Sequence, residues 1–152
     1  MGLKIYDEVK PDSFFSTGGT FENPLSLSFN GTSGEIIQKR YYVRNDDANY
    51  YYEGITIQPV DNGDNIVDGT GVTEGFMWQL IAGDQQPLEA QWDPEITEPG
   101  ASIVLGDIGS SSDGDIRSYI PFWLRITIPR GVAIKSYQGV TLKISASEGL
   151  VL

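Results

Sequence analysis

The feature that most constrains the fold is the spacing of apolar residues, which recur at every second position in several stretches of the chain. The clearest stretch covers residues 119–129, where two sets of side chains alternate: Phe122, Leu124, Ile126 and Ile128 against Trp123, Arg125 and Thr127. Successive side chains of a β-strand point to opposite faces, so this spacing predicts strands with one buried face. No stretch shows the spacing of an amphipathic helix, and we therefore expect an all-β protein.

The same pattern predicts seven strands: Leu25–Phe29, Glu35–Arg44, Tyr50–Pro59, Phe76–Ile81, Ser102–Leu105, Tyr119–Pro129 and Gly139–Ser147. The chain has 18 Gly and 8 Pro, and many of them lie between these stretches, as turns require. About seven short strands with two long polar loops, residues 61–75 and 106–115, are typical of an immunoglobulin-like (Ig-like) β-sandwich. A closed barrel is the alternative.

The strand pattern also predicts a core and one pair of neighbouring strands. We expect four side chains to face the opposite sheet: Leu124, Ile126, Leu142 and Ile144. The last two strands are joined through residues 130–138, so we expect them to pair within one sheet.

At 152 residues, the chain has the length of one domain. We assign residues 24–152 to the sandwich and residues 1–23 to an extended N-terminal arm or edge strand. The arm contains Phe14, Phe15 and Phe21 among small and charged residues, and such aromatics can anchor an extended segment on a neighbouring subunit. The alternative is that the arm covers an edge of its own sandwich.

The composition argues against several classes of function. There is no Cys and no His, which removes thiol nucleophiles, histidine acid–base chemistry and ordinary zinc sites, so we expect no enzymatic activity. A glycosidase could use two of the 21 acidic residues, but pairs of acids arise by chance in so acidic a chain. The net charge of −11 argues against nucleic-acid binding, and no apolar run has the ~20 residues of a membrane helix.

Two aspartate-rich loops are the candidate metal sites. They contain Asp61, Asp64 and Asp68 in one loop and Asp107, Asp113 and Asp115 in the other. Calcium prefers such oxygen ligands, yet neither loop has the spacing of a calcium-binding loop motif. Asp and Gly are also the ordinary residues of solvated turns, so we expect no bound metal or other cofactor.

Aromatic residues supply the candidate binding surface. Five tyrosines are concentrated in two neighbouring stretches: Tyr41, Tyr42, Tyr50, Tyr51 and Tyr52. Trp123 lies on the strand face opposite the apolar set, next to Arg125, and Trp and Arg are enriched at protein interfaces. We therefore predict Trp123 and Arg125 as surface anchors, with carbohydrate binding as the alternative use of the aromatics.

Four segments resemble small virion proteins of tailed bacteriophages, many of them from phages of aquatic bacteria. They are KIYDEVKPDSFFSTGGTFENPLSLSFNG, RYYVRNDDANYYYEGITIQPVD, FMWQLIAGDQQP and IPFWLRITIPRGVAIKSYQGVTLKISASEG. The resemblance implies an Ig-like structural protein with no catalytic residues, made in the host cytoplasm and assembled into the virion. Together with the acidity and small size, it favours a capsid decoration or cement protein whose partners are the major capsid protein and copies of itself. A neck, tail or baseplate protein, or a carbohydrate-binding module for host attachment, is the alternative.

Overall fold

The computed structural model describes residues 2–6, 34–61, 77–110, 119–130 and 140–151. Apart from one 3-10 turn, η1 (Glu89–Trp92), their regular structure consists of seven β-strands. The strands are β1 (Leu3–Tyr6), β2 (Glu35–Asn45), β3 (Tyr50–Asp61), β4 (Met77–Ala82), β5 (Ile103–Ile108), β6 (Tyr119–Ile128) and β7 (Val140–Leu150). The expected all-β class is confirmed. Among the described residues, no helix has the length and apolar character needed to cross a membrane.

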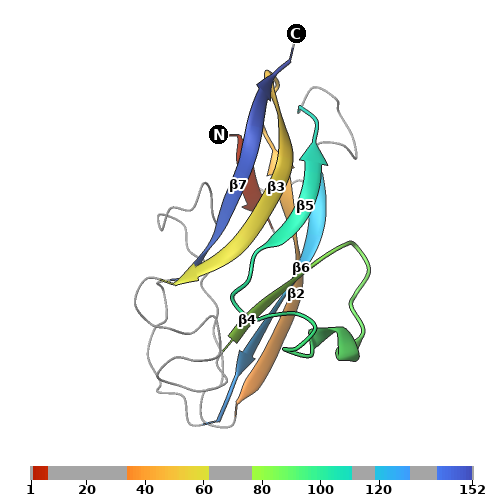
Figure 1. The fold of residues 1–152 in the computed structure, drawn as a ribbon, viewed down its shortest axis with the longest axis vertical. Coiled ribbons are helices and arrows are strands. Elements are labelled where there is room, and N and C mark those ends of the chain that lie inside the picture. Colours follow the sequence, from red (N-terminus) through yellow and green to blue (C-terminus); the bar gives the residue numbers. More distant parts are fainter. Residues whose placement is uncertain (1, 7–33, 62–76, 111–118, 131–139, 152) are drawn as a thin grey trace.

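The strands form two antiparallel sheets, and these confirm the sandwich. One sheet has the order β1-β2-β6-β4 and the other the order β5-β3-β7. Figure 1 looks onto β7, β3 and β5, with β2 and β6 behind them. From β2 to β7, consecutive strands alternate between the two sheets. An immunoglobulin domain instead pairs its last two strands with each other, so the strand order here differs from that of an immunoglobulin domain.

This alternation corrects one prediction, the pairing of the last two strands. β6 lies between β2 and β4, whereas β7 pairs with β3 in the opposite sheet. A short connection between two strands fits a hairpin, but it can also cross the ~10 Å that separates packed sheets. Alternation along a strand reports which face is buried and does not report which strand lies next to it.

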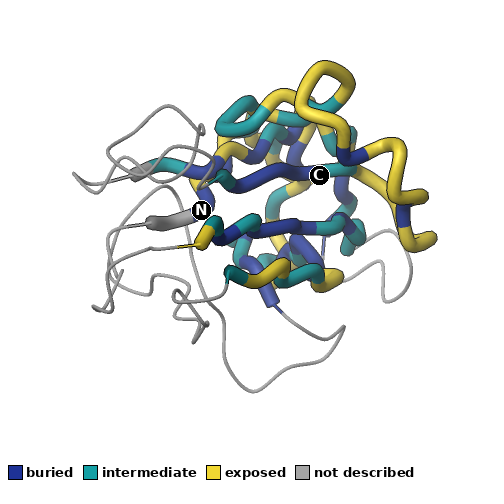
Figure 2. Tube along the Cα trace, turned by 90° about the horizontal axis from the view of Figure 1, so that it is seen from below, coloured by how far each residue is buried: buried dark blue, intermediate teal, exposed yellow. Residues whose placement is uncertain are grey.

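The core lies between the inner faces of the sheets, and the predicted core residues are all in it. Their exposed fractions are 2% for Leu124, 3% for Ile126, 0% for Leu142 and 2% for Ile144. They pack in one cluster with side chains from β1 to β5, including Tyr41, Ile55 and Leu80. The buried residues follow the strands, while the exposed ones concentrate in connecting segments (Figure 2). The predicted register of the two strands is therefore confirmed.

β1 is an edge strand of the four-stranded sheet. It pairs with β2, placing Leu3 opposite Asn45 and Ile5 opposite Val43. Leu3 and Ile5 have no exposed surface, so the first residues belong to the core of their own sandwich. Phe14, Phe15, Phe21 and the predicted strand Leu25–Phe29 lie outside the described residues.

Candidate functional site

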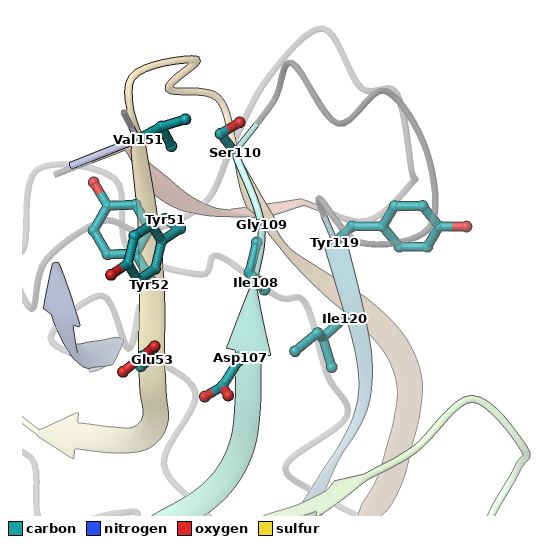
Figure 3. A pocket seen from close by; sticks show the side chains of 10 residues that line it. All are labelled: Tyr51, Tyr52, Glu53, Asp107, Ile108, Gly109, Ser110, Tyr119, Ile120 and Val151. Atoms are coloured by element: carbon teal, nitrogen blue, oxygen red, sulfur yellow. The ribbon is translucent and has the colours of Figure 1, made fainter. Parts of the chain in front are cut away.

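A pocket of about 580 Å³ opens at one end of the sandwich, where β3, β5 and β6 approach the C-terminal end of the chain (Figure 3). Its walls combine aromatic, aliphatic and acidic side chains: Tyr51, Tyr52, Glu53, Asp107, Ile108, Gly109, Ser110, Tyr119, Ile120 and Val151. This volume lies in the range of small-molecule sites, which are mostly apolar with a few polar groups that orient the ligand.

A β-bulge shapes one wall of the pocket. Tyr52 pairs with Ile108 and Ile55 with Gly106, so two residues of β3, Glu53 and Gly54, face only Asp107 on β5. Gly54 has φ +61°, a conformation that glycine adopts without strain. The Gly54 backbone N–H donates a hydrogen bond to Asp107 Oδ1 at 2.9 Å, in place of a regular pairing. Glu53 and Asp107 are two exposed carboxylates on adjacent strands, at the position of this bulge (Figure 3).

Tyr51 supplies an exposed aromatic ring to the same pocket. It pairs across strands with Gly149, and a Cβ atom on that glycine would lie only 2.2 Å from Tyr51 Cζ. The phenol ring therefore occupies the space that a side chain on β7 would take, while 38% of the Tyr51 surface stays exposed. Any larger residue at position 149 would displace the ring, so the glycine fixes its position.

Tyr52 and its polar partners form the buried side of the pocket. The Tyr52 hydroxyl donates to Glu148 Oε2 at 2.9 Å and accepts from the Gly2 backbone N–H at 2.8 Å. Burial raises the pKa of Tyr52, the Gly2 hydrogen bond lowers it, and Glu148 raises it again. This hydroxyl connects the N-terminal strand to β3 and β7, so the pocket wall depends on the position of β1.

The five tyrosines of the two dense stretches serve different purposes. Tyr41 and Tyr52 are core residues at 1% exposed, whereas Tyr51 faces the pocket. Tyr42, at 8% exposed, packs edge-on against Tyr119 with 5.8 Å between the ring centroids. The ring of Tyr119 is therefore engaged on the outer face of the four-stranded sheet. Tyr50 packs partly buried against the core.

Trp123 lies half-buried on that outer face, as the alternation of β6 predicts. Its indole Nε1 donates to the Asp84 carbonyl oxygen at 3.1 Å. Arg40 lies over both the Trp123 and Tyr42 rings, 6.0 Å and 5.5 Å from their centroids, and its Nη1 is 2.9 Å from Asp84 Oδ1. Trp123 is thus held in place by neighbours of its own chain, and its role as an interface anchor stays a prediction.

The expectation that Arg125 is a surface residue is wrong. Arg125 is only 7% exposed, its Nη2 lies 2.9 Å from each carboxylate oxygen of Glu89, and its guanidinium lies over the Trp92 ring at 5.5 Å. The segment that contains η1 covers this part of the outer face. Gln79, at 2% exposed, fastens it by donating to the carbonyl oxygens of Trp92 and Thr97, both at 2.8 Å. The one sign in the sequence that this outer face is covered was Gln79, a polar residue in a strand that is otherwise apolar.

The candidate metal loops fall mostly outside the described residues. Asp64, Asp68, Asp113 and Asp115 are not described, nor is the side chain of Asp61. Asp107 is described, and it accepts the hydrogen bond from Gly54. Within the described part of the chain, no three acidic side chains are grouped as a metal ion would require.

Tyr6, the last residue of β1, forms a second polar contact with Asp46. The Tyr6 hydroxyl donates a hydrogen bond to Asp46 Oδ2. Burial, this hydrogen bond and the charge of Asp46 raise the pKa of Tyr6 from 10.0 to about 12, and Arg44 lowers it in part.

This shift predicts a loss of stability at alkaline pH. The folded chain keeps a proton on Tyr6 that the unfolded chain releases above pH 10, so the free energy of unfolding should fall as the pH rises from 10.0 to about 12. Urea unfolding at a series of pH values should show this decline, and Tyr6→Phe should make it shallower. Equal slopes for the two proteins would contradict the prediction.

Comparison with known proteins places the chain in no family: no family model, no curated protein and no solved structure matches it.

Proposed function

We propose that the protein is a non-enzymatic structural component of a tailed-phage particle, bound at high copy number to the head as a decoration protein. The observation that carries this proposal is the resemblance of residues 4–31, 40–61, 76–87 and 120–149 to small virion proteins of tailed phages. The net charge of −11 fits a protein displayed outward, because like-charged surfaces keep neighbouring copies soluble and apart.

The architecture supports the proposal by analogy. Double-sheet β-sandwiches occur in viral capsid domains, although they also occur in lectins, so a fold alone does not assign a function. A contact surface that is ordered before assembly binds at a lower cost in free energy, because ordering a loop on binding is unfavourable.

The segment over β4 and β6 provides such a surface. Gln79 and Arg125 fasten it to the sheet, as described above, and it presents two large aliphatic side chains to solvent. Leu88 is 74% exposed and Ile96 is 69% exposed. We propose that these two side chains, together with Phe14, Phe15 and Phe21 of the arm, contact the major capsid protein or further copies of this chain.

The copy number in purified particles tests the proposal. Quantitative mass spectrometry should give a ratio of this protein to the major capsid protein that is close to a simple fraction. Such a ratio is expected for a protein that binds at repeated positions of the head lattice. A copy number comparable with that of a tail ring would place the protein in the neck, tail or baseplate and would contradict the decoration role. Absence from the particles would remove the structural proposal altogether.

Two sets of substitutions test the contact surface. The double variant Leu88→Asn and Ile96→Asn should fold normally, because both side chains are exposed, and should fail to join particles. Val104→Asn is the matched control, since Val104 is 68% exposed on β5 of the other sheet. The arm is tested by replacing its three Phe with Ser. Normal incorporation of both variants would exclude these side chains as the contacts.

A further inference from the structure

We propose that the pocket at the end of the sandwich binds an organic cation, through an ammonium or guanidinium group that enters beside Tyr51, Glu53 and Asp107. The inference goes beyond the structural role proposed above and does not depend on it. The cation can come from a free small molecule or from a Lys or Arg side chain of a partner, and the chemistry of recognition is the same for both.

The described lining of the pocket is negatively charged. Of the ten described residues that line it, two are acidic and none is a Lys or Arg. Neither Glu53 nor Asp107 forms an ion pair with a described residue, and within the described part of the chain the one hydrogen bond at these two carboxylates is the one that Asp107 accepts from Gly54. Two carboxylates without a described counter-charge give this part of the surface a negative charge, which attracts a cation.

The pocket also contains the aromatic ring of Tyr51. Tyr51 is fixed over Gly149 and remains 38% exposed, so the pocket contains an exposed aromatic ring as well as two acids. The face of an aromatic ring attracts an ammonium or guanidinium group, and the attraction increases where the cation is partly withdrawn from water. A ring whose position is set before binding also reduces the entropy cost of ordering the site.

The pocket also has a bulged strand and an apolar wall. A regular pairing of β3 with β5 would place one residue opposite each partner, whereas the bulge adds a residue and turns the strand. The carbon chain of a Lys or Arg can lie along the apolar wall made by Ile108, Ile120 and Val151 while its charged end reaches the acids. The volume of about 580 Å³ is sufficient for one such side chain.

The experiment is a nuclear magnetic resonance titration of the full chain with four probes: tetramethylammonium, N-acetyl-arginine amide, N-acetyl-citrulline amide and N-acetylglucosamine. Citrulline has the shape of arginine without its charge. We expect the arginine probe to shift the amide signals of residues 51–54 and 107–109, and the citrulline probe to bind at least roughly fivefold more weakly. Binding of tetramethylammonium as well would indicate a site for free small cations. Binding of the arginine probe alone would indicate a side chain of a partner.

Variants separate the pocket from the general acidity of the chain. Glu53→Gln with Asp107→Asn should weaken binding roughly tenfold, and the Asn side chain keeps an oxygen for the Gly54 N–H. Glu95→Gln with Glu98→Gln removes the same charge from exposed positions outside the pocket and should leave binding unchanged. Tyr51→Leu, which retains an apolar side chain, should weaken binding roughly threefold. Thermal unfolding confirms that each variant is folded.

Three results would overturn the proposal. Equal weakening by the two double variants would mean attraction to the net charge alone. Equal binding of the arginine and citrulline probes would mean that charge is not recognised. Binding of N-acetylglucosamine without binding of either cation would make the pocket a sugar site.

Discussion

Replacing Leu124 with Ala should lower the free energy of unfolding by about 2–5 kcal/mol, the usual cost of emptying a well-packed core position. Leu124 is 2% exposed and lies on β6, the strand between β2 and β4. It pairs with Lys39 of β2 and Leu80 of β4, and its side chain belongs to the cluster between the sheets. Paired strands on both sides hold the backbone of β6, so the cavity cannot close by a local shift.

Urea unfolding followed by circular dichroism measures the effect, with the slope of the transition as the test that the denatured state is unchanged. Leu88→Ala is the matched control: it makes the same chemical change at a position that is 74% exposed, and should cost no more than about 0.5 kcal/mol. A domain of this size has about 5–15 kcal/mol of stability in total, so the core variant should be easily distinguished. Equal costs for the two variants would mean that β6 does not face the core as described.

The strands and their buried faces could be predicted from the sequence because both depend on local alternation. The expected strand Glu35–Arg44 differs by one residue from β2, and the inward positions of β6 and β7 were correct. The pairing of strands could not be predicted in the same way. It depends on which sheet each connection returns to, and the assignment of β6 and β7 to one sheet was wrong for that reason.

The pocket could not be predicted from the sequence for a similar reason, because it depends on which strands pair. Glu53 gave no signal, and Asp107 was considered only as a calcium ligand in its own loop. The contact between Gly54 and Asp107 joins residues 53 positions apart, through a bulge that shows in the sequence only as a glycine within a strand. The position of Tyr51 likewise depends on Gly149, which becomes its neighbour only once β3 and β7 are paired.

For Arg125, the predicted direction of the side chain was correct, but the predicted exposure to solvent was wrong. Its side chain does leave the strand on the face opposite Leu124, as predicted. That face is covered by the segment around Glu89 and Trp92, so a position that alternation marks as outward is buried. Period-two patterns distinguish the two faces of a sheet, but they do not show which outer faces receive a further layer.

Deleting residues 1–6 should have the second large effect, a loss of about 3–6 kcal/mol of stability. The deletion removes Leu3 and Ile5, each with no exposed surface, and burying one such side chain contributes about 1.5–3 kcal/mol. It also removes the hydrogen bond from Gly2 to the Tyr52 hydroxyl and the one that the Gly2 carbonyl accepts from Asp46. Urea unfolding measures the loss, and Lys4→Gln serves as the control because Lys4 lies on the same strand with its side chain 32% exposed. Stability equal to that of the full chain would mean that β1 is dispensable.

The truncated chain should also associate with itself. Without β1, the edge of the sheet moves from this strand of 4 residues to β2, which has 11, and long exposed edges recruit strands from other molecules. Sedimentation velocity should therefore show association that grows with concentration for the truncated chain and not for the Lys4→Gln control.

The role of β1 in stability also decides how the arm hypothesis can be tested. A truncation through residue 20 removes β1 together with Phe14 and Phe15, so a failure to join particles would follow from lost stability alone. Only substitutions that leave β1 in place can attribute that failure to the three Phe side chains.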